Sequence, residues 1–421
     1  KEAIIQSYKK CGWDLDLSIN LEKDSFFPTF IDLLEELKNV IKLSEYSEEV
    51  KANYIGSLTT RVKSLTNGLN GQIFSSKEID NEILFDTNVI VDLSRIGSQE
   101  TKSLLMGILV MRLSEYRMST SKTSNRKLHH ITVLEEAHNI LRAKNSVSSV
   151  EGSNVAEKAV EMISNAIAEM RTYGEGFIIA DQSPSAVDIS AIRNTNTKII
   201  MRLPEENDRK IAGKSAALKD EQINEIARLP KGVAVVYQND WIEAVLCQIN
   251  KFDGEEKEYN YKDEEIYNEK KKINSTLINF ILNNRLDSPD KINQKEVEDA
   301  IENFEGSTQL KIELLSLLNQ YRRDGKLKLW QNDEEKANLF KQSIIVKNIL
   351  ELDDVVKEFR YKTFSVQEPD YVLNTLIDQK IEKFNTEILL EIKECLIRSY
   401  IDDNRNITEE EIDILRKNIV Q

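Results

Sequence analysis

Short apolar runs alternate with stretches of helical periodicity between residues 81 and 252. Fully apolar strands that alternate with helices are typical of a mostly parallel sheet covered by helices on both faces. The sequence therefore predicts an α/β core in this region. The predicted strands lie at residues 89–93, 131–134, 177–180, 198–203, 233–237 and 245–249, and the predicted helices near residues 98–117, 154–173, 206–213 and 220–228.

Helical periodicity flanks this core on both sides. Apolar residues recur at three- and four-residue spacing from about residue 26 to residue 65, which predicts a small helical bundle within residues 1–80. The charged run at residues 253–258 is typical of a solvated linker. Residues 258–421 contain two glycines, Gly306 and Gly325, and keep helical spacing of apolar residues, so we expect an all-α C-terminal domain there.

The charge balance limits the partners of the chain. The 57 Lys and Arg residues against 72 Asp and Glu residues give a formal net charge of -15, which excludes a globally basic nucleic-acid-binding surface. Cys11, Cys247 and Cys395 are too far apart for a disulfide framework or a zinc site, so we expect a reducing, cytoplasmic compartment. The most apolar stretch, residues 104–111, is too short to span a membrane.

Two adjacent acids follow the apolar run at residues 131–134. Paired carboxylates repel one another unless a cation or solvent compensates them, so Glu135 and Glu136 indicate a metal site. In a sheet that hydrolyses nucleotides, the first acid can hold Mg²⁺ and the second can polarise the attacking water. An ordinary strand end with solvated acids remains an equal alternative. For His138, which comes next, we expect a capping or packing role in preference to a contact with the site.

A second apolar run, at residues 177–180, ends in Asp181 and Gln182 after a helix that stops at a glycine turn. Because neighbouring parallel strands end at the same edge of a sheet, polar residues of both runs are expected at that edge. Gln182 can contact a γ-phosphate or orient a water there. A glutamine that caps the following loop is equally compatible with this segment.

Several segments in this order resemble the HerA/FtsK superfamily of RecA-like ring ATPases, and specifically the HerA-like DNA translocases. The resemblance covers roughly residues 80–250, and the helices within residues 13–71 look like the helical insertion of such proteins. The segments that carry the resemblance are Val-Ile-Val-Asp-Leu-Ser at 89–94, Val-Leu-Glu-Glu-Ala-His at 133–138, Glu-Met-Arg-Thr-Tyr-Gly-Glu-Gly at 169–176, Ile-Ile-Ala-Asp-Gln-Ser-Pro-Ser at 178–185, Val187-Asp188, residues 194–203, Asp208, and residues 229–234.

The resemblance implies a RecA-like, mostly parallel sheet core at residues 81–252, which carries ATP and Mg²⁺. It implies that Glu135 is the Walker B acid near magnesium, although the family pattern has Asp there, and that Glu136 is the catalytic base. Gln182 would be the sensor of the γ-phosphate. Arg171 would be donated to the site of a neighbouring subunit, so that the working unit is a closed homo-oligomeric ring, a hexamer.

A phosphate-binding loop of the Walker A type is missing from the printed chain. That motif needs Gly, four residues, and then Gly-Lys-Ser/Thr, so that backbone amides and the lysine wrap the phosphates. Residues 213–215 read Gly-Lys-Ser, but Asp208 stands where the first glycine belongs, within a predicted helix. We reject this segment as a P-loop. We expect the loop upstream of residue 1; its loss from the protein is the alternative.

A local basic segment is the candidate contact for DNA. Residues 117–127 contain no acid among their Ser and Thr residues, and we expect a loop whose cations contact phosphates, namely Arg117, Lys122, Arg126 and Lys127. The polar segment at residues 144–154 is a second candidate for a ring channel. A solvated loop is the alternative for both segments.

These observations together favour an ATP-hydrolysing DNA translocase or helicase that acts as a ring. The expected partners are DNA, further copies of the chain, and a nuclease or effector protein, with phage defence as a role that the resemblance allows. Two alternatives stay open. One is a structural ring or assembly scaffold with a degenerate ATPase, in which residues 258–421 recruit partners, and the other is a conjugation-type secretion ATPase.

Overall fold

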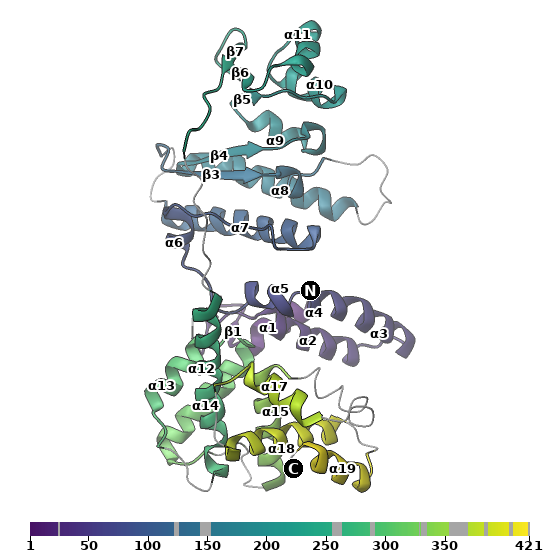
Figure 1. Ribbon diagram of the computed structural model, residues 1–421, viewed down its shortest axis with the longest axis vertical. Helices are drawn as coiled ribbons and strands as arrows, with labels where there is room; N and C mark the ends of the chain where they lie inside the picture. The colour runs from purple at the N-terminus through teal and green to yellow at the C-terminus, as the bar shows by residue number, and fades with distance from the viewer. Residues whose placement is uncertain are drawn as a thin grey trace. The chain divides into compact units, whose positions relative to one another are not determined.

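The computed structural model describes residues 1–23, 26–121, 126–143, 153–254, 263–286, 291–327, 329, 335–352, 369–382, 386–403 and 407–419. The chain divides into two compact units, Ile79–Glu258 and Lys1–Glu78 together with Tyr259–Gln421. The helices and strands of both units can be followed in Figure 1. No helix within the described ranges is both long and apolar enough to cross a membrane.

Two parallel strands lie at the centre of the Ile79–Glu258 unit. Strand β3, His130–Glu135, pairs with β4, Glu175–Ala180, so that Glu135 lies opposite Ala180 at their carboxyl ends. Their connection contains α8, Ser153–Met170, and parallel strands require a crossover of this kind. The two strands therefore end at the same edge of the sheet, which confirms the expectation from the sequence.

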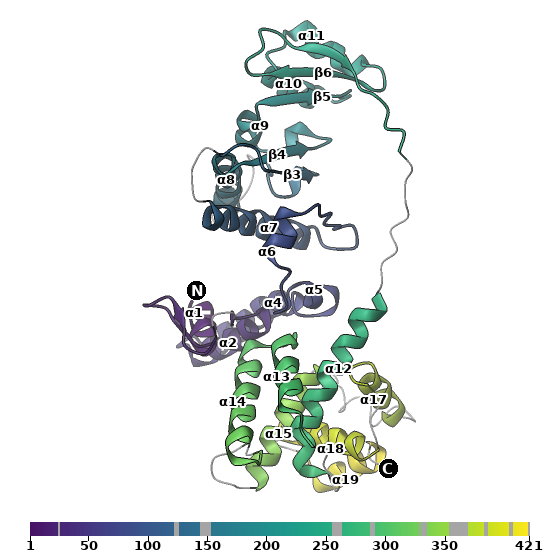
Figure 2. The ribbon, with the colours of Figure 1, turned by 90° about the vertical axis from the view of Figure 1, so that its left-hand side faces the viewer.

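Helices cover one face of this strand pair (Figure 2). Alternation along the strands places Ile131, Val133 and Ile178 on the other face, where their side chains are exposed. The covered face packs into a core that includes Val110, Leu113, Leu134, Ala166 and Met170. The surrounding helices are α6, Asn81–Asp86, α7, Gln99–Thr120, α8, and α9, Ile189–Asn194.

The second sheet of this unit is antiparallel. β5, Thr197–Ile200, pairs with β6, Val233–Gln238, which in turn pairs with β7, Val245–Gln248. Residues 239–244 join β6 to β7, and so short a connection permits only an antiparallel hairpin. The expectation of a mostly parallel sheet is therefore wrong for the described strands, among which only β3 and β4 run parallel. The helices beside this sheet are α10, Glu206–Ser215, and α11, Asp220–Glu225.

Residues 89–93 do not form the predicted strand. Val89, Ile90 and Val91 lie outside helices and strands, and Ile90 is 95% exposed. A strand needs a neighbour for its backbone N–H and C=O groups, and none of the described strands pairs with this segment. The Asp92 carboxylate instead accepts the Ser94 backbone N–H at 2.8 Å, which makes a local turn.

The second unit is helical and combines the two ends of the chain. A core of Leu, Ile and Phe side chains joins its C-terminal helices. The N-terminal elements are α1, Glu2–Lys10, the short strands β1, Trp13–Asp14, and β2, Ile19–Asn20, then α2, Phe30–Leu43, α3, Glu48–Tyr54, α4, Thr60–Ser64, and α5, Gly68–Ile73. The C-terminal helices are α12, Asp263–Leu282, α13, Gln294–Asn303, α14, Thr308–Asp324, α15, Glu335–Leu350, α17, Pro369–Asp378, α18, Thr386–Asp403, and α19, Glu409–Ile419.

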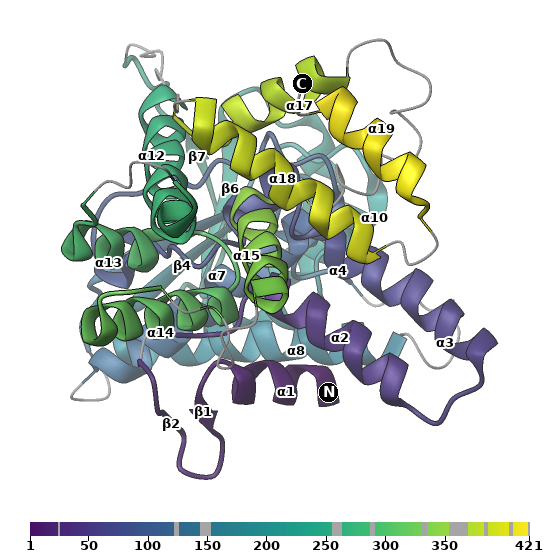
Figure 3. The ribbon, with the colours of Figure 1, turned by 90° about the horizontal axis from the view of Figure 1, so that it is seen from below.

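A buried carboxylate links the N-terminal helices to the C-terminal ones. Asp32 of α2 is fully buried and accepts hydrogen bonds from the Ser307 hydroxyl at 2.9 Å and from the backbone N–H groups of Thr308 and Gln309, each at 3.0 Å. These donors lie at the N-terminus of α14, where the helix dipole and unpaired N–H groups favour a negative charge. The two helical regions, which are separate in the sequence, thus share one unit (Figure 3).

Candidate active site

Two of the predicted site residues meet where β3 and β4 end. Glu136 directly follows β3, and Gln182 lies two residues beyond β4. The Gln182 Nε2 donates a hydrogen bond to the Glu136 Oε1 at 2.8 Å. Because the strands are parallel and in register, the sheet itself brings these two side chains together. Glu135 is the last residue of β3 and is exposed at the same edge.

The backbone of Glu136 has an unusual conformation. Its φ of 50° and ψ of 51° lie in the left-handed region, which disfavours a residue that has a Cβ atom. The chain turns there into a short 3₁₀ helix, Ala137–Asn139, and the Asn139 N–H donates to the Glu136 carbonyl at 3.0 Å. Such a conformation costs on the order of 1–3 kcal/mol and occurs preferentially at functional sites. The strained residue is also the predicted catalytic base.

Asp181 and His138 complete the site. They were not among the predicted site residues: the expected role of His138 was capping or packing, and Asp181 was placed at this edge without a role. The Asp181 Oδ2 accepts the His138 backbone N–H at 2.8 Å and lies 2.9 Å from the His138 Nδ1. Its Oδ1 accepts the Ser183 N–H at 2.8 Å, and the Asp181 side chain is 6% exposed. The His138 Nδ1 also lies 3.5 Å from the Glu136 Oε2. The sequence feature that could have identified them is their position, since Asp181 precedes Gln182 and His138 lies two residues after Glu136.

Three side chains of the site could offer ligand atoms to a metal ion, two of them carboxylate oxygens and one an imidazole nitrogen. Ligand atoms of Glu136, His138 and Asp181 lie within 4.8 Å of one another. Asp181, however, already receives three hydrogen bonds from the protein, which satisfy it without an ion. Carboxylates are the protein ligands that Mg²⁺ prefers, so the exposed carboxylates of Glu135 and Glu136 suit that ion better.

Arg171 lies at the other end of β4. It begins the short 3₁₀ helix Arg171–Tyr173, which follows α8 and precedes the strand, and its side chain is exposed. Gln182 follows the carboxyl end of the same strand, so the strand length separates them by about 20 Å. Arg171 therefore cannot reach the Glu136 carboxylate of its own chain.

Arg117 corrects the expectation of a basic loop. It lies in α7, is 4% exposed, and its guanidinium donates to the Glu175 Oε2 at 2.9 Å and to the Asp86 Oδ1 at 2.6 Å. Burial by itself lowers the pKa of Arg117, but the hydrogen bonds to Asp86 and Glu175 raise the pKa overall. Its placement on an exposed loop is wrong because α7 extends to Thr120 and two acids far away in the sequence bind the cation.

Of the other cations in the basic segment, the structure describes Arg126 and Lys127. Lys122 and residues 144–152 lie outside the described residues. Arg126 and Lys127 are exposed, and the Arg126 N–H donates to the Thr172 carbonyl at 3.1 Å. A Cβ atom on Gly174, whose φ is 85°, would lie 2.5 Å from the Lys127 carbonyl oxygen. The absence of a side chain at Gly174 therefore permits the basic segment to lie close to the turn that carries Arg171.

The structure agrees with the rejection of residues 213–215 as a phosphate-binding loop. They end helix α10, and Gly213 is packed so that an added Cβ would lie 2.6 Å from the Ile223 Cγ1. Asp208 of the same helix is buried and accepts the Ser185 N–H at 2.8 Å. Asp208 thus tethers the loop that follows Gln182.

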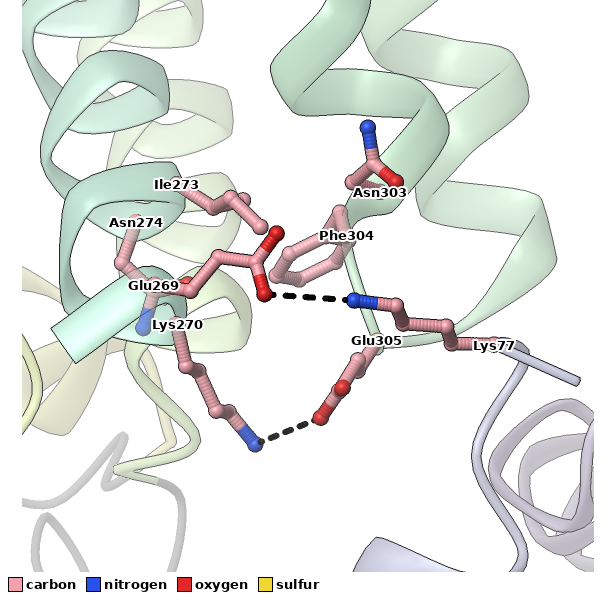
Figure 4. A pocket seen from close by; sticks show the side chains of 8 residues that line it. All are labelled: Lys77, Glu269, Lys270, Ile273, Asn274, Asn303, Phe304 and Glu305. Carbon is pink, nitrogen blue, oxygen red and sulfur yellow. Dashed lines mark hydrogen bonds and ion pairs between the residues drawn. The ribbon is translucent and has the colours of Figure 1, made fainter. Parts of the chain in front are cut away.

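A small hollow in the helical unit holds paired charges (Figure 4). The Lys77 Nζ lies 3.4 Å from the Glu269 Oε2, and the Lys270 Nζ lies 3.7 Å from the Glu305 Oε2. Opposite charges that are already paired give a ligand little to bind. The strand edge with Glu136 therefore remains the candidate site.

No protein-family model matches the chain. Among curated proteins it is similar to the DNA double-strand break repair helicase HerA of Sulfolobus acidocaldarius, with 26% identity over 256 residues that cover 54% of this chain and 48% of that protein. A probable helicase of Methanocaldococcus jannaschii is 24% identical over 184 residues, which cover 42% of this chain and 34% of that protein. The chain thus spans about half or less of the length of these relatives.

Solved structures give looser similarities. VirB4 of Thermoanaerobacter pseudethanolicus aligns with a TM-score of 0.44 at 12% identity, over 60% of this chain and 63% of that one. The genome packaging NTPase B204 of Sulfolobus turreted icosahedral virus 2, in complex with ATP-gammaS, aligns with a TM-score of 0.27 at 12% identity, over 41% of this chain and 77% of that one. It is the curated relatives that confirm the resemblance: this chain is similar to P-loop ATPases of the HerA/FtsK type.

Proposed function

We propose that the chain carries the hydrolytic residues of an ATP-driven DNA translocase or helicase, with a RecA-like core at residues 81–252. The observation that supports this most is the hydrogen bond between Glu136 and Gln182, at 2.8 Å, at the shared carboxyl edge of two parallel strands. Ligands of open α/β sheets bind at such an edge. The curated relatives are named as helicases, which makes nucleotide hydrolysis coupled to DNA the best-supported activity.

In this proposal each residue at the edge has a separate role. The Glu136 carboxylate accepts a proton from the water that attacks the γ-phosphate, and its 44% exposure leaves it accessible to that water. Gln182, already bonded to Glu136, orients the water or contacts the γ-phosphate. Glu135 holds Mg²⁺, which neutralises phosphate charge when it is bound. A phosphate-binding loop from outside residues 1–421 is required for this activity.

The proposal extends to the assembly. Because Arg171 lies at the opposite end of β4 from Gln182, its guanidinium can act on a nucleotide only in a neighbouring subunit. An arginine supplied in this way stabilises charge on the transferred phosphoryl group. This favours a closed ring with sites shared between subunits, and the family resemblance implies six of them. In this ring Arg126 and Lys127 contact DNA, and a nuclease or effector joins the ring in the cytoplasm.

Glu136→Gln in the complete protein tests the proposed function. The substitution keeps the shape of the side chain and one oxygen that can accept the Gln182 hydrogen bond, but it removes the base, so turnover should fall by about a hundredfold or more while ATP binding is kept. Glu161→Gln, on the exposed surface of α8, is the matched control and should leave turnover unchanged. Full steady-state ATPase in the Glu136→Gln protein would rule out this base. A complete protein that binds no ATP would favour the scaffold alternative.

A further inference from the structure

We propose that Asp181 and His138 are positioning residues, which hold the Glu136 carboxylate in its working orientation. The inference rests on the proposed role of Glu136 as the base. Neither residue needs to touch the nucleotide for this role. His138, held by Asp181, lies beside the Oε2 of the Glu136 carboxylate, and Gln182 donates a hydrogen bond to its Oε1.

The two oxygens of Glu136 face different partners. Its Oε1 accepts the hydrogen bond from Gln182 at 2.8 Å, and its Oε2 lies 3.5 Å from the His138 Nδ1. Both partners depend on the loop after β4, since Gln182 belongs to it and His138 is bound by Asp181. Two consecutive residues, Asp181 and Gln182, thus control both sides of one carboxylate.

Asp181 fixes both the backbone and the ring of His138. One oxygen, Oδ2, accepts the His138 backbone N–H at 2.8 Å and lies 2.9 Å from the ring Nδ1. Because a carboxylate only accepts hydrogen bonds, the proton of the ring must be on Nδ1 in this contact. The other oxygen is held by the Ser183 N–H at 2.8 Å, so Asp181 itself has a defined orientation.

The location of this pair explains how the strained turn is maintained. Glu136 has left-handed backbone angles, and the bond from the His138 N–H to Asp181 anchors the chain two residues later. A strained conformation persists only where its surroundings determine it, and a base must be held close to its productive geometry. The His138 ring, which Asp181 holds in place, also lies 3.5 Å from the Glu136 Oε2 and thereby limits the positions that this carboxylate can adopt.

The test compares His138→Ala with His138→Asn in the complete protein. Alanine removes the ring contact, whereas the Asn Nδ2 can replace Nδ1 as the donor to Asp181. We expect His138→Ala to lower kcat by about tenfold or more and to leave the Kd for ATP within about twofold, because misplacing a catalytic group affects turnover first. His138→Asn should keep at least about half of the kcat, since it retains the donor. The control His129→Ala alters an exposed histidine just before β3 and should change neither quantity.

A double substitution separates positioning from a structural role. In the Glu136→Gln background His138→Ala should lower the residual kcat by less than about twofold, because the group it positions is already absent. Equal losses in both backgrounds, or a His138→Asn protein as slow as His138→Ala, would overturn the proposal. Should His138→Ala fail to fold, Asp181→Asn serves as the second variant, and an unchanged kcat there would also overturn it. Failure of the proposed function is distinguishable, since Glu136→Gln would then leave ATPase intact.

Discussion

Replacing Arg117 by methionine removes a guanidinium from a buried polar cluster while keeping an apolar stem in α7. The guanidinium donates to the Glu175 Oε2 at 2.9 Å, to the Asp86 Oδ1 at 2.6 Å and to the Phe85 carbonyl at 2.5 Å. All three acceptors lose the guanidinium at once in Arg117→Met, although Glu175 keeps His130 and Thr132 as partners and Asp86 keeps Tyr116. The substitution therefore tests whether this cluster holds α6, α7 and the amino end of β4 together.

The expected loss of stability follows from the burial of the two acids. The Glu175 side chain is fully buried and would keep only His130, at 2.8 Å, and Thr132, at 2.7 Å, as partners. Leaving one member of a buried ion pair without its partner typically costs about 3–5 kcal/mol. The Asp86 side chain is 27% exposed, so water can replace Arg117 there at a cost of about 1 kcal/mol or less. We expect a total near the 3–5 kcal/mol of the buried pair.

Hydrogen exchange in increasing urea measures this effect locally, through peptides that contain β3 and β4. The free energy of opening should fall in Arg117→Met and stay unchanged in Arg193→Met, an exposed arginine of α9. Adding Glu175→Gln should recover part of the loss, because a neutral amide needs no cation. An Arg117→Met protein within about 1 kcal/mol of the wild type would refute the reasoning, since it would show that the pair contributes no more than a surface one.

The stability of the fold should depend on pH through the Asp86 carboxylate of the same cluster. Burial by itself raises the pKa of Asp86, but hydrogen bonds from Tyr116 and Arg117 lower the pKa below its usual value of 3.8. Because the pKa is lower in the folded state, Asp86 stabilises the fold at pH values above about 4, and this stabilisation is lost as the pH falls below that value. Arg117→Met should make this acid-dependent loss smaller.

Further expectations concern DNA, the ring and the helical unit. Neutralising Arg126 and Lys127 together should lower the slope of log Kobs for DNA against log salt by up to about two units, and an unchanged slope would remove both from the contact surface. Mixing Glu136→Gln subunits with Arg171→Ala subunits should restore part of the ATPase, because some junctions then combine both intact residues; no recovery in co-assembled rings would contradict the trans role. Asp32→Ala should destabilise the helical unit by about 2–4 kcal/mol, since a charged acceptor of several hydrogen bonds is lost; a loss under about 0.5 kcal/mol in urea unfolding would contradict that reasoning.

The parts of the site that were predictable lie next to strong local patterns. The apolar runs before Glu135 and before Asp181 determine two strands, and parallel pairing then places Glu136 near Gln182. The hydrogen bonds of Asp181 were not predictable, because they depend on the left-handed turn at Glu136. Strand periodicity cannot indicate such a turn at a residue other than glycine.

The errors have a common cause in contacts between distant residues. The sequence-based prediction placed Arg117 in a basic loop because no acid lies near it in residues 117–127. Its acidic partners, Asp86 and Glu175, are far away in the sequence. Residues 89–93 have the composition of a strand, yet composition does not supply a neighbouring strand. The antiparallel second sheet was partly predictable, since residues 239–244 are too few for a crossover. The contact between Asp32 and the start of α14 has no local signal at all.

The most direct test of the central claim is the structure of the complete protein bound to ATP-gammaS and Mg²⁺. We expect the γ-thiophosphate at the carboxyl edge of β3 and β4, with Gln182 within hydrogen-bonding distance of it or of the adjacent water, and with the Glu136 carboxylate next to that water. The metal ion should lie beside Glu135. A nucleotide bound elsewhere in the chain, with Glu136 and Gln182 away from its γ-phosphate, would contradict the assignment of this strand edge as the hydrolytic site.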